Sequence, residues 1–383
     1  MRGPRRPAAL IVALVILAGG CASATGHPAA PAQSAAPEFL ATSLATPGMT
    51  WAAIPMGAAS GPDLFWQLFA LPAAGTSWSL VTPPDIPTNG ALVLAGLGGR
   101  SLAAGMRPSL GLHYSPLTTT PDGGRTWAAG PVNAGLADVP DALAAVPGGG
   151  ELIALTSDGQ VGRASPAGTG WVPLTSKRSL AATPAGRGCG LARLTAAAYT
   201  PPGVPLLAGT CARHGVAGVF AYRDGSWQAA GPSLPASMVS QQVQVLRLTR
   251  TGTRDAALLQ AGTGPAATLV AAWSADGSHW TLSAPLRLGG PQVLSASFGN
   301  DGATAVVLAG SRAETIAGPG ASWRRLPVLP SGRTVLLALP AAGGIDALAA
   351  SGSKLSAWRL APGATAWART QSIKVPIQYG SSG

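Results

Sequence analysis

The side chains best suited to acid–base chemistry in this 383-residue chain are its 14 Asp and Glu residues, and five of them directly precede a glycine. These five are Asp122, Asp158, Asp224, Asp276 and Asp301. Hydrolysis of a glycoside requires two carboxyl groups on opposite sides of one cleft. An Asp in an Asp-Gly turn instead accepts hydrogen bonds from nearby backbone amides. We therefore interpret these five residues as turn residues and not as catalytic acids.

The other acidic residues and the tyrosines show no spacing that indicates a catalytic pair. The remaining acids, mostly at predicted strand borders, are Asp63, Asp85, Asp138, Asp141, Asp255, Asp346, Glu38, Glu151 and Glu314, and the tyrosines are Tyr114, Tyr199, Tyr222 and Tyr379. The sequence has no P-loop, no Rossmann glycine pattern, no Ser-His-Asp elbow and no zinc-ligand spacing. We predict no catalytic residue, no cofactor and no metal site.

One stretch, residues 120–127, carries the fullest turn pattern in the chain. Its Asp can close an Asx-type turn, a glycine two residues later can adopt positive φ without strain, and a Thr-Trp pair then begins a strand. Two further stretches repeat parts of this pattern. The residues of the three predicted turns are Thr120, Asp122, Gly124, Thr126 and Trp127; Ser274, Asp276, Gly277 and Trp280; and Asp224, Gly225 and Trp227.

Tryptophans that open predicted strands recur at intervals of 43 to 56 residues along the chain. They are Trp78, Trp127, Trp171, Trp227, Trp280, Trp323 and Trp367. A repeat of roughly 40–50 residues is typical of a four-stranded propeller blade. Gly and Pro, at 52 and 35 residues, interrupt nearly every helix-length window and favour short strands. In two successive periods we predict strands at Asp141–Val146, Glu151–Thr156, Gln160–Ser165 and Trp171–Thr175, and then at Leu191–Tyr199, Pro205–Cys211, Val216–Tyr222 and Trp227–Ala230.

The turn at residues 120–127 resembles the Asp-box, the Ser/Thr-x-Asp-x-Gly-x-Thr-Trp repeat of BNR/sialidase-like β-propellers. The resemblance implies an all-β fold in which such turns lie on the outer part of each blade, away from the central substrate site. Together with the period, it predicts a single β-propeller over residues 49–383 with seven four-stranded blades, six or eight remaining open. We expect the ring to close by pairing of Met49–Ile54 with Ile373–Ile377 in one blade, which would remove exposed sheet edges.

The amino-terminal residues indicate export. Arg2, Arg5 and Arg6 precede an apolar stretch that is too short to span a membrane, so residues 1–20 are predicted to be a signal peptide. Leu17 to Cys21 resembles a bacterial lipobox, which implies that Cys21 becomes the lipidated first residue of the mature chain. Residues 21–48 are rich in Ala, Pro and Ser and are predicted to be a flexible tether. The expected location is the outer face of the bacterial cytoplasmic membrane.

Two cysteines remain after Cys21, and an exported chain usually pairs such cysteines. We predict a structural disulfide between Cys189 and Cys211. The net charge of +11 arises from scattered Lys and Arg residues, and the only adjacent pairs after the leader are Lys177-Arg178 and Arg324-Arg325. This scatter argues against nucleic-acid binding.

Two functions remain open at this point. The favoured one is a monomeric, membrane-anchored, extracytoplasmic propeller that acts as a non-catalytic binding or scaffold module for a protein or a cell-envelope glycan. The alternative is a sialidase-like exported glycoside hydrolase, because sialidases are Asp-box propellers that use an Arg triad, a Tyr–Glu pair and an Asp. This chain lacks the early Arg-Ile-Pro motif of that family.

Overall fold

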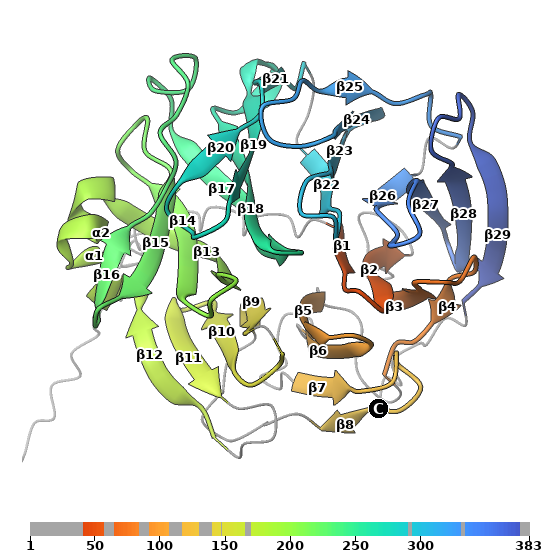
Figure 1. Cartoon of the computed structure of the whole chain (residues 1–383), viewed down its shortest axis with the longest axis horizontal. Coiled ribbons are helices and arrows are strands. Elements are labelled where there is room, and N and C mark those ends of the chain that lie inside the picture. The colour runs from red at the N-terminus through yellow and green to blue at the C-terminus, as the bar shows by residue number, and fades with distance from the viewer. Residues whose placement is uncertain are drawn as a thin grey trace, which may run out of the picture. The chain divides into compact units, whose positions relative to one another are not determined.

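The structure is a computed structural model that describes residues 41–56, 65–83, 92–106, 117–129, 140–146, 148–164, 170–289, 293–330 and 334–375 (Figure 1). The predicted signal peptide, Cys21 and most of the predicted tether lie outside these residues. The described part of the chain contains no helix with the length and hydropathy needed to cross a membrane.

The strands of the described residues follow one another in antiparallel groups of four, and the first strand of each group faces the middle of the arrangement (Figure 1). The first three groups are β1 (Ala41–Ala45), β2 (Met49–Met56), β3 (Phe65–Pro72) and β4 (Ser79–Leu80); β5 (Leu92–Gly98), β6 (Ser101–Met106), β7 (Leu117–Thr120) and β8 (Ala128–Ala129); and β9 (Pro140–Ala145), β10 (Leu152–Thr156), β11 (Gln160–Ala164) and β12 (Val172–Ser176). The next two are β13 (Leu191–Tyr199), β14 (Pro205–Cys211), β15 (Gly218–Arg223) and β16 (Ser226–Ala229), and β17 (Val243–Thr251), β18 (Arg254–Ala261), β19 (Thr268–Ser274) and β20 (Trp280–Leu282), with β21 (Leu286–Arg287) also pairing with β19. The last two are β22 (Val293–Phe298), β23 (Ala305–Ala309), β24 (Arg312–Ile316) and β25 (Arg324–Arg325), and β26 (Thr334–Ala338), β27 (Ile345–Ser351), β28 (Lys354–Leu360) and β29 (Ala368–Lys374).

The first strand, β1, lies inside the range predicted to be a tether. It pairs with β2 in antiparallel fashion and with β22 in parallel fashion, through Ala41↔Ser295 and Thr42↔Ala296. The first and sixth groups therefore form one continuous eight-stranded sheet. The folded unit begins by Ala41 and not at Met49, because residues of the predicted tether supply its first innermost strand.

The predicted closure by pairing of the two chain ends is wrong. Met49–Ile54 pairs with β1 and β3, and Ile373 pairs with Leu355 inside the last group. The first and last groups meet instead through side chains, with Phe69, Trp78 and Leu336 in one buried cluster. Packing of two complete sheets buries apolar surface without exchanging a strand, and each fully buried Phe or Leu contributes roughly 1.5–3 kcal/mol.

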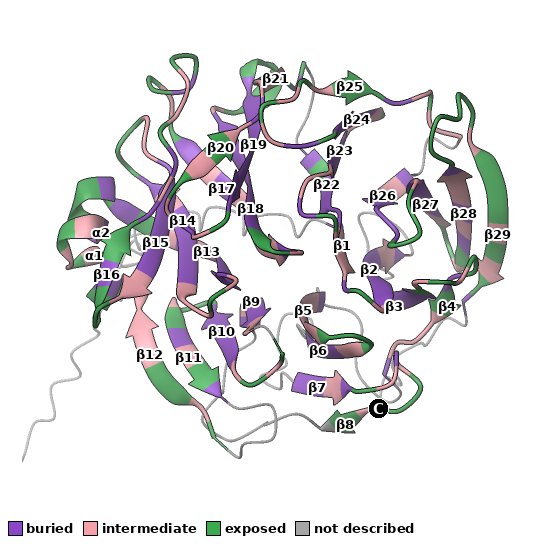
Figure 2. Cartoon of the chain, viewed as in Figure 1, coloured by how far each residue is buried: buried purple, intermediate pink, exposed green. Residues whose placement is uncertain are grey.

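The core lies between neighbouring sheets. Figure 2 shows buried residues along the middle strands, such as β10 and β19, whereas the outer strands β12 and β29 contain only intermediate and exposed residues. A second strand buried on both faces needs apolar residues at consecutive positions, as in the Leu-Ile-Ala-Leu run of β10. The middle strands therefore supply most of the apolar contacts between neighbouring sheets, and we call each such contact region a seam.

Two short helices follow β12. They are α1 (Lys177–Ala181) and α2 (Pro184–Cys189). The side chains of Ser176 and Thr183 cap their amino termini by accepting hydrogen bonds from Ser179 N and Gly186 N, as Ser and Thr commonly do. Gly190 ends α2 with φ 64°, a conformation that favours glycine. These caps are local signals for helices that the sequence analysis did not predict.

Candidate functional site

The Asp122 turn between β7 and β8 has the hydrogen bonds expected of an Asx-type turn. The amides of Arg125 and Thr126 donate to Asp122 Oδ1 at 3.0 and 2.9 Å, and Thr126 Oγ1 donates to Oδ2 at 2.7 Å. The amide of Gly124, at φ 85°, donates to Thr120 Oγ1 at 2.9 Å. The hydrogen bonds from the Thr126 backbone and side chain lower the pKa of Asp122 to about 2. The carboxylate serves the turn and is no general acid at neutral pH.

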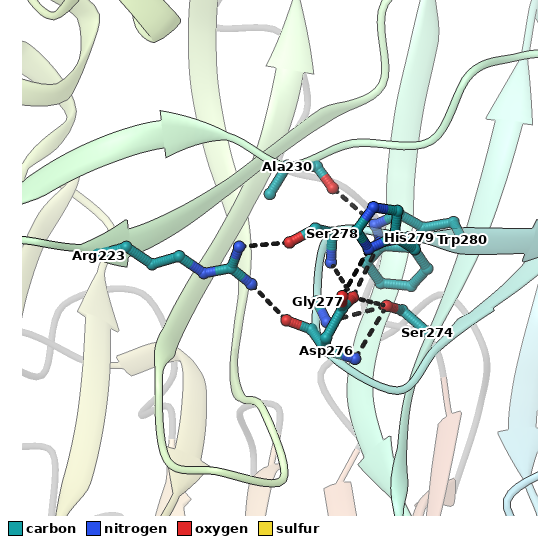
Figure 3. A network of polar contacts seen from close by, with 8 residues as sticks. All are labelled: Arg223, Ala230, Ser274, Asp276, Gly277, Ser278, His279 and Trp280. Carbon is teal, nitrogen blue, oxygen red and sulfur yellow. Dashed lines mark hydrogen bonds and ion pairs between the residues drawn. The ribbon is translucent and has the colours of Figure 1, made fainter.

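The Asp276 turn between β19 and β20 repeats this arrangement with one residue fewer (Figure 3). Ser278 N and His279 N donate to Asp276 Oδ1 at 2.8 and 2.9 Å, and Gly277 N donates to Ser274 Oγ at 2.9 Å. His279 Nδ1 lies 2.6 Å from Asp276 Oδ2. The bonds from His279 hold the pKa of Asp276 well below its usual range. The shortened pattern therefore produces the same kind of turn.

An arginine of the preceding group also holds this turn. Arg223, at the end of β15, donates hydrogen bonds from its guanidinium to Ser278 Oγ and to the backbone carbonyl of Asp276 (Figure 3). These bonds cross the seam between the fourth and fifth groups. The Asp276 turn therefore contributes to the joint between two neighbouring sheets as well as to its own hairpin.

The third predicted turn is of a different kind. Asp224 and Gly225 form a two-residue hairpin between Arg223 and Ser226, with φ angles of 51° and 74°. Positive φ at both central residues is typical of a type I′ turn, for which Asp-Gly is a preferred sequence. Asp224 and Gly225 are thus correctly placed in a turn, but they do not repeat the Asp122 pattern. The ring of Trp227 lies against that of Tyr222 in the same hairpin, with the centroids 5.2 Å apart and the planes tilted by 50°.

The repeated tryptophans join neighbouring groups, a role that the sequence analysis missed. Four of them donate an indole N–H bond to a backbone carbonyl just after the outer strand of the preceding group. These bonds are Trp127 to Val81 at 3.1 Å, Trp280 to Ala230 at 2.6 Å, Trp323 to Ala284 at 3.0 Å and Trp367 to Pro327 at 3.2 Å. These four tryptophans are half-buried, and a Tyr or Trp polar group that is shielded from water usually finds a hydrogen-bond partner. That requirement and the regular spacing of the tryptophans were the sequence signals for these bonds.

Replacing Trp127 with Ala is expected to lower the free energy of unfolding by about 1–3 kcal/mol. Full burial of the ring would give about 3–5 kcal/mol, but Trp127 is only half-buried and loses one hydrogen bond to Val81. Trp127→Phe keeps most of the apolar contact and should lose about 1 kcal/mol. Urea unfolding of both variants measures these losses. Equal stability of Trp127→Ala and the unaltered chain would contradict the inter-sheet role of this residue.

The described residues contain one Tyr–Glu–Arg arrangement, which sequence spacing did not reveal. Tyr199 at the end of β13 donates to Glu151 Oε1 at 2.5 Å, and Arg163 Nη1 lies 3.8 Å from Glu151 Oε2. Tyr199 ends β13, an innermost strand, but its side chain is buried in the cluster between the third and fourth groups. Burial raises the pKa of Tyr199, and the hydrogen bond to Glu151 raises it further. A phenol that resists ionisation is a poor nucleophile.

The innermost strands are joined by polar contacts centred on Arg247 of β17. Its guanidinium donates to the carbonyls of Ala296 on β22 and Ser43 on β1, at 2.9 and 2.5 Å. Ser43 Oγ donates to Ser297 Oγ at 2.7 Å, and Ser297 Oγ donates to the Leu337 carbonyl at 2.6 Å. Burial lowers the pKa of Arg247 to about 10, which leaves it charged at neutral pH. These side chains bind the protein's own backbone.

The remaining acids occupy several structural settings. Asp346 binds Arg359 with two hydrogen bonds, Arg312 pairs with Glu314 at 3.0 Å, and Arg193 lies 3.8 Å from Asp141. Asp301 accepts bonds from its own hairpin, and Asp158 does the same in the β10–β11 turn. Among the described residues no three or more His, Cys, Asp or Glu side chains form a metal-binding group. The residues Glu38, Asp63, Asp85, Asp138, Tyr114 and Tyr379 lie outside the described ranges.

The predicted disulfide is confirmed. Cys189 at the end of α2 is bonded to Cys211 at the end of β14, with the Cα atoms 5.0 Å apart. Both cysteines are buried. The bridge ties the helical connection after β12 to the second strand of the following group.

Comparison with known proteins identifies the architecture. No family model and no curated protein matches the sequence. Among solved structures, a protein from Lactobacillus plantarum is similar over 86% of this chain and 97% of its own, with 10% identity and a TM-score of 0.54. A GH74 xyloglucanase from Xanthomonas campestris is similar over 87% of this chain, which spans only 54% of the enzyme, with 14% identity and a TM-score of 0.54.

A third similar structure is a putative 6-phosphogluconolactonase from Bacteroides fragilis, with 10% identity and a TM-score of 0.52 over 86% of this chain and 96% of that one. Identities of 10 to 14% carry information on fold alone. The four-stranded antiparallel groups around a common centre agree with these matches. This chain is therefore an all-β protein with the β-propeller fold.

Proposed function

We propose that this chain is a membrane-anchored, extracytoplasmic β-propeller that serves as a non-catalytic binding or scaffold module for a protein or a cell-envelope glycan. The observation that carries the proposal is the engagement of the innermost strands with one another. Arg247, Ser43 and Ser297 are committed to backbone and side-chain bonds between β1, β17, β22 and β26. A catalytic propeller would present such polar groups to a substrate.

The Tyr199–Glu151–Arg163 arrangement is the feature closest to the alternative, a sialidase-like hydrolase. It includes only one arginine, whereas a sialidase binds the substrate carboxylate with three. Its tyrosine is only 2% exposed. The hydrogen bond from Tyr199 to Glu151 resembles the one that activates a tyrosine nucleophile, but it also joins two neighbouring sheets. A structural hydrogen bond at the seam accounts for all of these features, so we favour binding over hydrolysis.

The membrane anchor rests on the sequence. We propose that residues 1–20 are removed on export, that Cys21 carries the lipid, and that the mature monomer remains on the outer face of the cytoplasmic membrane. We also assign the Asp122 and Asp276 turns to the Asp-box type, because their carboxylates accept the amides that follow in the turn. In this assignment the turns stabilise the fold and leave the ligand unspecified.

Turnover measurements on sialosides and aryl glycosides test the proposal, with cell fractionation as a second readout. We expect no hydrolysis by the unaltered chain, and we expect Cys21→Ser to move the protein from the membrane fraction to the soluble fraction in high-salt buffer, which screens electrostatic binding. Hydrolysis that is abolished by Tyr199→Phe, with folding retained, would replace the proposal with the hydrolase alternative. Membrane association in high-salt buffer that Cys21→Ser leaves unchanged would reject the lipid anchor.

A further inference from the structure

The stretch from residue 159 to residue 223 contains seven Lys and Arg residues and no Asp or Glu. It includes α1, α2 and both bridged cysteines. Three of its arginines are already engaged within the fold. Arg163 and Arg193 lie 3.8 Å from Glu151 and Asp141, and Arg223 binds the Asp276 turn. Of the others, Lys177, Arg178 and Arg187 lie on the helices, and Arg213 lies just after β14.

Three exposed arginines, Arg178, Arg187 and Arg213, form what we call the basic platform. Arg178 lies in α1 and Arg187 in the last turn of α2, where its guanidinium donates to the carbonyl of Ala182 between the two helices. The amide of Arg213 donates to the Cys189 carbonyl at 3.1 Å, which holds Arg213 beside the end of α2. In Figure 2 these two helices lie at the rim of the propeller and are partly exposed.

The platform is fixed by its own covalent and apolar contacts. Leu180 of α1 and Cys189 of α2 are buried, and the disulfide joins α2 to β14. None of the three platform arginines forms an ion pair within the part of the chain that the structure describes. Three exposed cations on adjacent segments, without an ion-pair partner there, create a positive potential that attracts an anionic surface.

We propose that the basic platform docks on the anionic phospholipid headgroups of the membrane to which the chain is tethered, an inference that rests on the proposed lipid anchor. Only 19 residues lie between Cys21 and Ala41. Even a fully extended chain of that length spans at most about 70 Å, so the membrane is the anionic surface always within reach. A lipid and a basic patch together give firmer and better-oriented membrane binding than a lipid alone.

Vesicle co-sedimentation tests this docking without the lipid anchor. The chain from residue 21 onward, carrying Cys21→Ser, is mixed with phosphatidylglycerol or with phosphatidylcholine vesicles at low salt. We expect binding to phosphatidylglycerol alone, weakened by added salt. The triple variant R178E/R187E/R213E should bind phosphatidylglycerol about 100-fold more weakly, since each basic side chain near an anionic surface contributes a several-fold effect.

The matched control is R287E/R324E/R325E, which changes the net charge equally on exposed strands β21 and β25. It should retain most of the binding, and near-UV circular dichroism checks that both triple variants fold. Equal binding by the two variants, or equal binding to both kinds of vesicle, would overturn the platform. Because lipidation is absent from this experiment, its failure leaves the Cys21 anchor and the binding-module proposal to their own tests.

Discussion

Replacing Asp346 with Ala is expected to lower the free energy of unfolding by about 3–5 kcal/mol, the loss typical of breaking a buried ion pair on one side. Asp346 is 1% exposed and accepts hydrogen bonds from Arg359 Nε and Nη2 at 2.7 and 2.9 Å. It also accepts the indole N–H of Trp78 at 2.9 Å, from the first group of strands. The substitution removes the acceptor of the buried Trp78 indole and of the partly buried Arg359 guanidinium, between the first and last groups.

Urea unfolding measures this loss, and two further variants serve for comparison. Asp301→Ala removes a carboxylate that serves only an exposed hairpin and should cost about 1 kcal/mol. Asp346→Asn keeps one acceptor but loses the charge, so its loss should lie between the other two. If Asp346→Ala were no more damaging than Asp301→Ala, the contact between the first and last groups would depend on apolar packing and on the bonds of Gln371 to the Trp78 backbone, and not on Asp346.

The strand pattern could be predicted from sequence because each group repeats the same local signals. The predicted strands Leu191–Tyr199 and Pro205–Cys211 match β13 and β14 residue for residue. The predicted turn of Asp122 is also confirmed in its hydrogen bonds. The Asp346–Arg359 pair could also have been predicted, because a two-residue turn after Ser351 places these residues opposite each other in β27 and β28.

Features that depend on contacts between distant groups could not be predicted in this way. The strand β1 consists of Ala, Thr, Ser and Leu, a composition equally typical of a linker, and its parallel partner β22 lies about 250 residues away. The bond between Tyr199 and Glu151 joins two successive groups, so only the packing of the sheets reveals it. Asp224 was misassigned because Asp-Gly suits both the type I′ hairpin and the longer turn.

Asp255 is expected to make the stability of the protein fall as the pH rises from about 4 to 8. Its side chain is fully buried at the start of β18, and neither carboxylate oxygen has a hydrogen-bond partner among the described residues. Burial raises the pKa of Asp255 to about 8; the Asp276 carboxylate acts in the same direction, and Arg250 and Arg223 oppose it. In the unfolded chain the pKa is near 3.8. The protonated form therefore prevails in the folded protein at neutral pH.

The sign of the effect follows from this difference. Below pH 4 the carboxyl is protonated in both states, and its contribution to stability is fully present. Between pH 4 and 8 only the unfolded chain ionises, so stability falls by at most about 1.4 kcal/mol per pH unit. Above pH 8 the folded protein ionises too, and this contribution declines no further.

Asp255→Asn removes the titration while keeping the size of the side chain. We expect this variant to gain stability over the unaltered chain by several kcal/mol between pH 4 and pH 8, measured as the difference in urea midpoints across that interval. Asp301→Asn, at an exposed turn, serves as the matched control and should follow the unaltered chain. A constant difference between Asp255→Asn and the unaltered chain at every pH would show that Asp255 is ionised inside the folded protein, with Arg250 and Arg223 outweighing the effect of burial.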